Sequence, residues 1–359
     1  MYNSGNSWKF LSRVSKVHDP HDVDEYQSFE LNSCYSYHAH LNGSIPRDTF
    51  LRLRALAAGK HPELASDFSF DSHTLDQFFA AFQNDIYKVT DNPQAVTTAT
   101  VSVLESFEKD GCIYLELRTT PRDSQFMDKA RYLDTVLKAI ESYDQTKMII
   151  RLLVSVDWRH TPEEALAIID LAQKERGRGI VGIDVCGDPS KSGRYRGLLP
   201  ALRKAKEEYN LKITVHFSEI ESQGPYLDHQ LRDLKPDRLG HATFLTASAQ
   251  NHVIENQLPI EVCITSNLLT KTVESVEEHH VKWAVNNGIP VLISTDDTLL
   301  FDTTSSNEYK LALQLLGGDR ALLLNQIKMG IEITFGTDED KAWMRSKIDD
   351  FTKDGLECS

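Results

Sequence analysis

The sequence predicts a (β/α)₈ barrel, in which eight parallel strands alternate with outer helices, and three observations lead to this fold class. Short runs rich in β-branched residues alternate with longer amphipathic runs over most of the 359 residues. Several short runs, such as MIIRLLVSV and GIVGIDVC, are almost continuously apolar, as parallel strands buried on both faces are. Eight such runs separated by helical patterns favour a closed barrel over a doubly wound sheet.

The expected strands and helices follow one another in chain order. The strand candidates are Cys34–Leu41, Cys112–Thr119, Met148–Val156, Ile180–Cys186, Lys212–Ser218, Arg238–Leu245, Ile260–Ser266 and Val291–Thr295. The clearest helical patterns between them are Tyr132–Tyr143, Pro162–Glu175, Leu199–Tyr209 and Val276–Asn287. Thr161 is a typical N-cap, because Pro162 follows it in the first helical position and acidic residues occupy the first turn.

A long helical segment interrupts this alternation after the first strand. We expect residues 31–359 to form the barrel, residues 1–30 to be an extension, and residues 47–110 to be a helical insertion that covers the active-site face. Further helices after the last strand would complete the outer ring. They are Ser306–Leu316, Arg320–Glu332 and Glu339–Asp350.

An apolar stripe with helical spacing marks the insertion as a candidate lid. Its members are Leu75, Phe78, Phe79 and Phe82. The same spacing is also explained if these side chains only attach the insertion to the barrel. Both interpretations stay open from the sequence.

The composition limits which kinds of partner the protein can bind and in which cellular compartment we expect it. The formal net charge of −14 argues against a nucleic-acid polymer or an anionic membrane, because both require a basic surface. A small anionic ligand needs only a few local cations or a helix N-terminus, so it is still compatible with this charge. The five cysteines include no CxxC pair, and no apolar run approaches the length of about 18 residues that spans a membrane. We therefore expect a protein of the cytoplasm, specifically the cytosol. We also expect a monomer, although none of these observations bears on the oligomeric state.

The residue types at the expected strand ends indicate a metal site. His38 and His40 are two residues apart on the first strand, so both imidazoles project from the same face. Barrel closure brings the last strand beside the first and therefore brings Asp296 to the histidines. His216 at the end of the fifth strand completes three imidazoles and one carboxylate. This set suits one zinc ion per chain with a position left for water.

Two more residues at strand ends are candidates for acid–base chemistry. Glu219 follows His216 by three residues and is well placed to donate a proton to a substrate, and His241 ends the sixth strand. Zinc makes hydroxide available near neutral pH, and the groups around it then orient or protonate the reactants. Each histidine taken singly is best explained as a structural residue. The joint pattern is what predicts a site.

Six motifs occur in order along the chain: HAHLNGS, GIDVCGDP, HFSE, RLGHATFL, CITSN and STDD. Together they resemble the signature set of the adenosine/AMP deaminase family of the amidohydrolase superfamily, from about Ser36 to the C-terminus. The resemblance implies a (β/α)₈ barrel with a single zinc and hydrolytic removal of an amine from C6 of a purine. The HxE…PCxxC signature of the other zinc deaminases is absent from the sequence.

The resemblance also implies a role for individual residues. It implies the same four zinc ligands that the residue types indicate, which are His38, His40, His216 and Asp296. Glu219 would protonate purine N1, and His241 would orient and stabilise the attacking hydroxide. Asp297 would contact purine N7, and the backbone N–H of Gly187 would reach N3.

Within the family, the sequence most resembles the adenosine deaminase-like proteins, which act on N6-methyl-AMP and give IMP and methylamine. Asn42 stands where adenosine deaminases have an aspartate that meets the ribose 5′-hydroxyl, and an amide would not repel a 5′-phosphate. Gly187-Asp188-Pro189 replaces their GDE, and YLELRTTPR resembles the same subfamily. One alternative is an adenosine or adenine deaminase, which would give inosine or hypoxanthine and ammonia. Another is an inactive barrel kept as a binding protein, against which the complete ligand set argues.

A nucleotide substrate requires hydrogen-bond donors for its phosphate. The polar candidates are Asn42, Ser44, His73 and Thr74, with Arg122 as a less certain one. His73 and Thr74 lie at the start of the expected lid helix, where backbone N–H groups point outward. Phe78 and Phe82 are the expected apolar contacts to the substrate. Each polar candidate could instead be an ordinary cap or surface residue.

Overall fold

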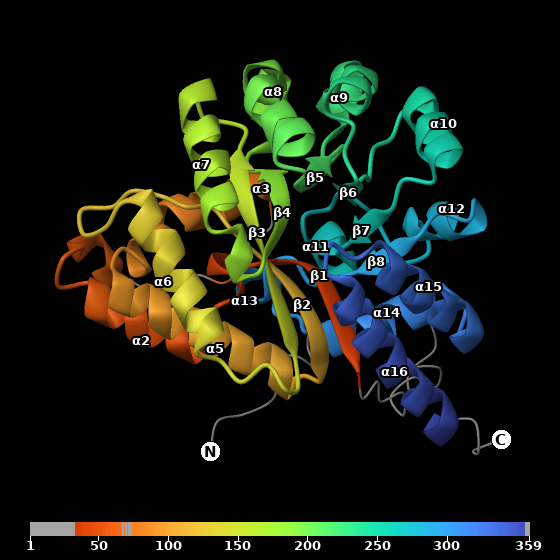
Figure 1. Ribbon diagram of the computed structural model, residues 1–359, viewed down its shortest axis with the longest axis horizontal. Coiled ribbons are helices and arrows are strands. Elements are labelled where there is room, and N and C mark those ends of the chain that lie inside the picture. The colour runs from red at the N-terminus through yellow and green to blue at the C-terminus, as the bar shows by residue number, and fades with distance from the viewer. Residues whose placement is uncertain (1–32, 67, 69, 71–73, 356–359) are drawn as a thin grey trace.

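The computed structural model describes residues 33–66, 68, 70 and 74–355, and in them eight parallel strands follow one another around a barrel in chain order (Figure 1). The strands are β1 (Cys34–His40), β2 (Cys112–Thr119), β3 (Ile149–Asp157), β4 (Ile180–Cys186), β5 (Lys212–Phe217), β6 (Arg238–His241), β7 (Ile260–Val262) and β8 (Val291–Ile293). The barrel closes between Asp296 and β1. The Asp296 N–H donates to the carbonyl of His38 at 2.9 Å, and the His40 N–H donates to the carbonyl of Asp296 at 3.3 Å. The predicted fold class is confirmed.

Helices surround the barrel and connect successive strands (Figure 1). The connecting helices are α5 (Pro93–Lys109), α6 (Lys129–Glu141), α7 (Pro162–Lys174), α8 (Tyr195–Arg203), α9 (Leu227–Leu234), α10 (Ala247–Asn256) and α12 (Val281–Asn286). Helix α7 begins as its sequence predicts. The Thr161 hydroxyl accepts from the Glu164 N–H at 3.2 Å, and the Glu164 carboxylate accepts from the Thr161 N–H at 2.9 Å, which is a capping box.

Several short elements fill the connections between these helices and strands. Those at the strand ends are η1 (Asn42–Ser44), η5 (Pro189–Arg194), η7 (Glu221–Tyr226), α11 (Ile264–Leu269) and α13 (Thr298–Phe301). At the opposite ends of the helices lie the 3₁₀ turn η4 (Arg176–Arg178) and the π-helical turn η6 (Lys204–Glu208).

The insertion and the C-terminal helices are also present. The insertion contains α2 (Arg47–Ala57), η2 (Pro62–Ala65), α3 (Leu75–Ala81), the π-helical η3 (Phe82–Ile86) and α4 (Tyr87–Val89). After β8 come α14 (Ser305–Leu315), α15 (Arg320–Ile333) and α16 (Asp338–Gly355). The predicted extension, residues 1–30, lies outside the described residues. None of the helices in the described part has the length and apolar character that a membrane crossing requires.

Some predicted boundaries were wrong at the end of the barrel that carries the candidate site. The strands predicted as Arg238–Leu245, Ile260–Ser266 and Val291–Thr295 stop at His241, Val262 and Ile293. Residues Ile264–Leu269 form α11 rather than the end of a strand. The β-branched run after Cys263 favours a strand locally, but the Glu308 carboxylate accepts the Thr265 N–H at 3.2 Å and holds the chain in a new direction.

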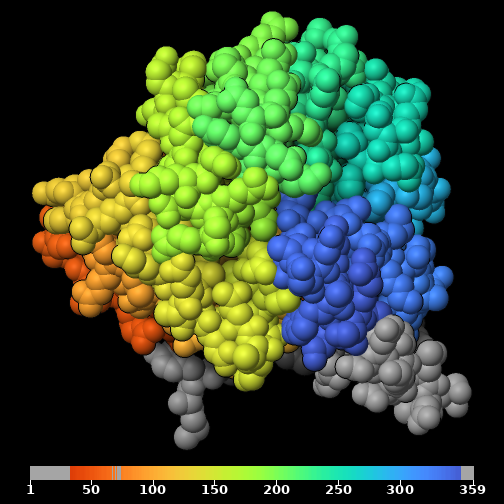
Figure 2. Space-filling model, in the orientation of Figure 1, coloured from red at the N-terminus to blue at the C-terminus, as the bar shows by residue number. Residues whose placement is uncertain are grey.

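Buried polar side chains of several strands contact one another across the barrel interior. Arg118 on β2 reaches Asp184 on β4 and Glu261 on β7, which are not its neighbouring strands, so these contacts cross the interior. Side chains fill the spaces that the ribbons leave open (Figure 2). A barrel with a buried charged interior is a scaffold that fixes the orientation of other polar groups.

Candidate active site

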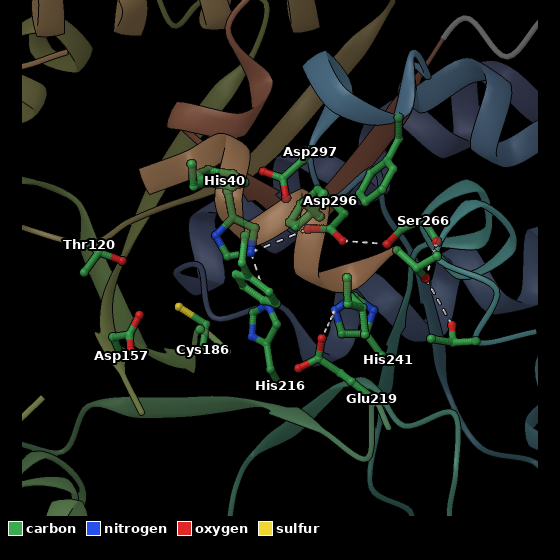
Figure 3. A pocket seen from close by; sticks show the side chains of 18 of the residues that line it. His40, Thr120, Asp157, Cys186, His216, Glu219, His241, Ser266, Asp296 and Asp297 are labelled. Atoms are coloured by element: carbon green, nitrogen blue, oxygen red, sulfur yellow. Dashed lines mark hydrogen bonds and ion pairs between the residues drawn. The ribbon is translucent and has the colours of Figure 1, made fainter. Parts of the chain in front are cut away.

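Three imidazoles and one carboxylate converge at the carboxyl ends of the strands. The Nε2 atom of His40 lies 3.2 Å from Nε2 of His38 and 3.1 Å from Nε2 of His216. Oδ1 of Asp296 lies 3.7 Å from Nε2 of His38 and 3.6 Å from Nε2 of His40. His40, His216 and Asp296 point toward one another (Figure 3). The structure thus brings together all four predicted ligands.

The hydrogen bonds behind these rings show that a cation fits between them. Nδ1 of His38 lies 3.0 Å from Oε2 of Glu261, and Nδ1 of His216 lies 3.1 Å from Oδ1 of Asp184. A carboxylate only accepts, so Nδ1 carries the hydrogen, and Nε2 of a neutral ring presents a lone pair to the centre. A tetrahedral ion that binds nitrogen at about 2.05 Å sets its ligands about 3.3 Å apart. The observed spacing of the nitrogen atoms is close to that value.

Burial and charge act differently on the three rings in the metal-free protein. Burial lowers the pKa of His40 to about 3 and that of His38 well below its usual range. Burial also lowers the pKa of His216, but the Asp184 carboxylate outweighs it and raises the pKa to about 9. A metal that binds here must therefore displace a proton from His216 at neutral pH.

Strained backbone conformations aim two of the site residues. Asp296 has a φ of 62° and His241 has a φ of 60°, both in the left-handed region that residues with a Cβ rarely adopt. His241 is the last residue of β6 and Asp296 follows the end of β8, so the turn at each strand end redirects the side chain into the site. Such conformations cost about 1–3 kcal/mol each and persist only where the surroundings impose them.

The acidic residues that hold the histidines, Asp184 and Glu261, are not predicted by the sequence patterns. Arg118 is fully buried, and its guanidinium donates to Oδ1 of Asp184 at 3.0 Å and to Oε2 of Glu261 at 2.5 Å. One cation therefore fixes both carboxylates that orient His38 and His216. Their position in the middle of apolar strand runs gave no local signal, although a charged residue in such a run is itself unusual.

Glu219 and His241 form the second half of the site. Oε2 of Glu219 lies 3.8 Å from Nε2 of His241, and Oε1 has no hydrogen-bond partner among the described residues. Burial raises the pKa of Glu219 to about 7, against the opposing charge of His216. Burial lowers the pKa of His241 to about 3. A protonatable acid thus faces a neutral imidazole (Figure 3).

Asp297 lies against a backbone that tolerates only glycine. A Cβ added to Gly43 would lie 1.5 Å from Oδ1 of Asp297. Burial, and then the adjacent Asp296, raise the pKa of the Asp297 carboxyl well above its ordinary value. Gly187 has a φ of 99°, and a Cβ there would lie 2.4 Å from Oδ2 of Asp157. Both Asp297 and Gly187 line the same pocket as the histidines.

Aromatic residues of the insertion form the apolar wall of this pocket. Leu75, Phe78, Phe79 and Phe82 all line it. The ring of Phe78 stacks on Phe301 of α13, with the ring centroids 5.0 Å apart and the planes at 7°. The stripe therefore both contacts the barrel side and faces the cavity. Whether it moves as a lid stays a prediction.

The residues predicted to bind phosphate are dispersed. The Asn42 amide is buried and donates to the Tyr132 hydroxyl at 2.9 Å, and the Ser44 hydroxyl donates to the Asp296 carbonyl at 3.3 Å. Neither is among the residues that line the pocket. Thr74 is exposed and caps α3 by accepting from the Gln77 N–H at 3.3 Å, and His73 lies outside the described residues.

Arg122 has a distinct environment. Its guanidinium lies 4.6 Å from the ring centroids of both Tyr87 and Tyr132. Nη2 donates to Oδ1 of Asn42 at 3.2 Å, and Nη1 is buried without a hydrogen-bond partner among the described residues. Tyr87 lines the pocket, so this cation lies directly behind the wall.

The chain is similar to known proteins over most of its length. The family model described as adenosine deaminase matches residues 34–351. The N6-mAMP deaminase of Arabidopsis thaliana is 34% identical, over 87% of this chain and 95% of the relative. The N6-methyl-AMP deaminase of Danio rerio is 36% identical, over 86% and 94%. A crystal structure described as Arabidopsis ADAL complexed with IMP superposes with a TM-score of 0.85 at 33% identity, covering 93% of this chain and 100% of that one.

Proposed function

We propose that this chain, which belongs to the adenosine deaminase family, hydrolyses N6-methyl-AMP to IMP and methylamine. The observation that carries the proposal is the convergence of three imidazole nitrogens and a carboxylate at a pocket that is also lined by a protonatable buried glutamate and a neutral histidine. Relatives that align over most of their length carry the name of this activity, and the Arabidopsis neighbour holds IMP, the expected product.

The metal in the proposal is one zinc ion per chain, held by His38, His40, His216 and Asp296. Imidazole and carboxylate ligands suit zinc, and Nδ1 hydrogen bonds to carboxylates fix two of the rings in the required tautomer. When bound, zinc lowers the pKa of a coordinated water to about 7 and so makes a nucleophile available near neutral pH.

Glu219 supplies the proton that the reaction needs on the purine ring. With a pKa of about 7, a large share of the Glu219 side chains carries a proton at neutral pH. Its free Oε1 lets it donate to purine N1, which makes C6 more electrophilic. His241 is neutral, so its Nε2 can accept a hydrogen bond from the attacking water and orient it.

The remaining pocket residues hold the base. Burial raises the pKa of the Asp297 carboxyl and so favours its protonated form, which can donate a hydrogen bond to N7, an atom that only accepts. The N–H of Gly187, which lines the pocket at a position where a Cβ would overlap Asp157, is the proposed donor to N3. Phe78 and Phe82 offer apolar surface to the purine.

Preference for a nucleotide rests on Arg122 and Asn42. Behind the pocket wall, Nη1 of Arg122 has no hydrogen-bond partner among the described residues, and the groups to which Nη2 donates are neutral, including the Asn42 amide. Because residue 42 is not an aspartate, the positive charge of Arg122 is available to the phosphate. In this arrangement Asn42 acts through Arg122 rather than by direct contact.

A comparison of four substrates on the zinc-loaded protein tests the proposal. N6-methyl-AMP should be turned over with a kcat/KM about 30- to 150-fold above those of adenosine and N6-methyladenosine, since the lost charged contact to the phosphate costs about 2–3 kcal/mol. AMP keeps the phosphate, so its kcat/KM measures separately the contribution of the N6-methyl group. Preference for adenosine would contradict the nucleotide specificity while leaving a purine deaminase. Inactivity toward all four would contradict the proposed function.

We further propose that the protein acts as a monomer in the cytosol. The acidic charge favours a dispersed protein that meets its small nucleotide substrate by diffusion. Light scattering after size-exclusion chromatography and cell fractionation test these two points.

A further inference from the structure

The carbonyl group of His241 is left without a strand partner by the way β6 ends. The pairing between β6 and β7 stops at Gly240, which lies opposite Glu261. His241 and Ala242 then take φ values of 60° and 52°, which turn the His241 carbonyl out of the sheet. A buried carbonyl without a donor is costly, so a partner from elsewhere is required.

That partner is the side chain of His280, which directly precedes α12. Its Nε2 lies 2.7 Å from the His241 carbonyl oxygen and must be the donor, because a carbonyl only accepts. Burial lowers the pKa of His280 to about 4, so the ring is neutral and its proton stays on Nε2. The ring stacks on His279, with centroids 4.6 Å apart and planes at 18°.

The other side of the same turn is held by backbone hydrogen bonds. The N–H of Ala242 donates to the Phe217 carbonyl at 2.9 Å, and those of Thr243 and Phe244 donate to the Ser218 carbonyl at 3.1 and 2.9 Å. The turn that carries the His241 imidazole is therefore fixed on one side by β5 and on the other by His280.

We propose that His280 is a positioning residue for the deaminase reaction: its N–H holds the carbonyl of His241 and thereby keeps the His241 imidazole opposite Glu219 and the metal ligands. The expected effect on kcat rests on the proposed function. The expected effect on the stability of the turn after His241 rests on the hydrogen bond alone. His279 packs against His280 but makes no bond to this turn, and it serves as the control.

The test compares three variants of the full-length, zinc-loaded protein. His280→Gln keeps an N–H donor near the position of Nε2, and His280→Phe keeps the stacked ring but removes the donor. His279→Phe keeps the stack and the His280 bond and removes the hydrogen bond that Nδ1 of His279 accepts from the Val281 N–H at 3.3 Å. We expect His280→Phe to lower kcat for N6-methyl-AMP by about 10- to 100-fold with KM and zinc content unchanged, since a small misplacement of a reacting group has effects of this size. His280→Gln should recover most of the loss, and His279→Phe should match wild type.

Amide hydrogen exchange of the peptide that contains residues 242–244 gives a readout independent of activity. Exchange should be at least about tenfold faster in His280→Phe, as expected for a turn that opens more readily, and near wild type in His280→Gln. Unchanged exchange and kcat in a folded His280→Phe would overturn the proposal, as would equal losses in both variants. If His280→Phe does not fold, His280→Asn, whose amide stops short of the carbonyl, replaces it with the same expectation. Inactive wild-type protein with the predicted exchange pattern would instead count against the proposed function.

Discussion

Replacing Glu219 with glutamine should remove activity and stabilise the protein at the same time. The amide has the shape of the carboxyl group but cannot donate a proton to N1. General acid catalysis contributes about 10²- to 10⁴-fold to a rate, so kcat of the zinc-loaded Glu219→Gln protein should fall by that factor. KM and zinc content should change little, because the acid acts mainly in the transition state.

The gain in stability follows from the pKa of Glu219 in the metal-free protein. Burial raises this pKa from the ordinary 4.5 to about 7. Below pH 4.5 the folded and unfolded chains both hold the proton, so the side chain has no effect on stability. Above about pH 7 both have lost it, and the buried charge costs the folded state about 3 kcal/mol. Glutamine carries no charge and avoids this cost.

Thermal unfolding of the two metal-free proteins across the pH range checks this reasoning. At pH 8 the variant should melt about 6 °C above wild type, if each kcal/mol shifts the Tm of a chain of this size by about 2 °C. The two melting curves should converge toward pH 4.5. A variant that keeps kcat within about tenfold of wild type would refute the role of Glu219 as the acid. Equal melting temperatures at pH 8 would refute the raised pKa.

Three further changes test other parts of the site. Asn42→Asp should pair with Arg122 and raise the KM for N6-methyl-AMP about tenfold with little change in kcat, and an unchanged KM would exclude Arg122 from phosphate binding. Gly43→Ala should abolish activity, because the added Cβ would overlap the Asp297 carboxyl. Gly59→Ala is the control: its Cβ would meet only the Leu56 carbonyl oxygen, at 3.8 Å, so this variant should behave as wild type in the same assay. Removal of metal by a chelator should abolish turnover and lower the Tm. Addition of zinc at about 100 times its Kd should restore about 2.7 kcal/mol of stability. Activity that survives complete metal removal would contradict the metal centre.

The sequence predicted the barrel and the residues that meet at its carboxyl end, because strand alternation and barrel closure are general rules. The spacing of His38 and His40 sufficed to put both rings on one face. Asp184 and Glu261 could not be found in this way, since each lies inside an apolar strand run and is needed only because Arg118 reaches it from another strand. The same holds for His280, whose bond to the His241 carbonyl depends on where β6 and β7 stop pairing. Tertiary contacts also decided that the chain after Cys263 forms α11 rather than a longer strand.

Product analysis in ¹⁸O-labelled water tests the central claim most directly. The zinc-loaded protein should convert N6-methyl-AMP to equal amounts of methylamine and IMP, and the IMP should carry one ¹⁸O atom, at C6, because the attacking oxygen comes from solvent. Mass spectrometry of a single turnover reads both products. Formation of unlabelled IMP, or of any product other than IMP and methylamine, would contradict hydrolytic deamination at this site.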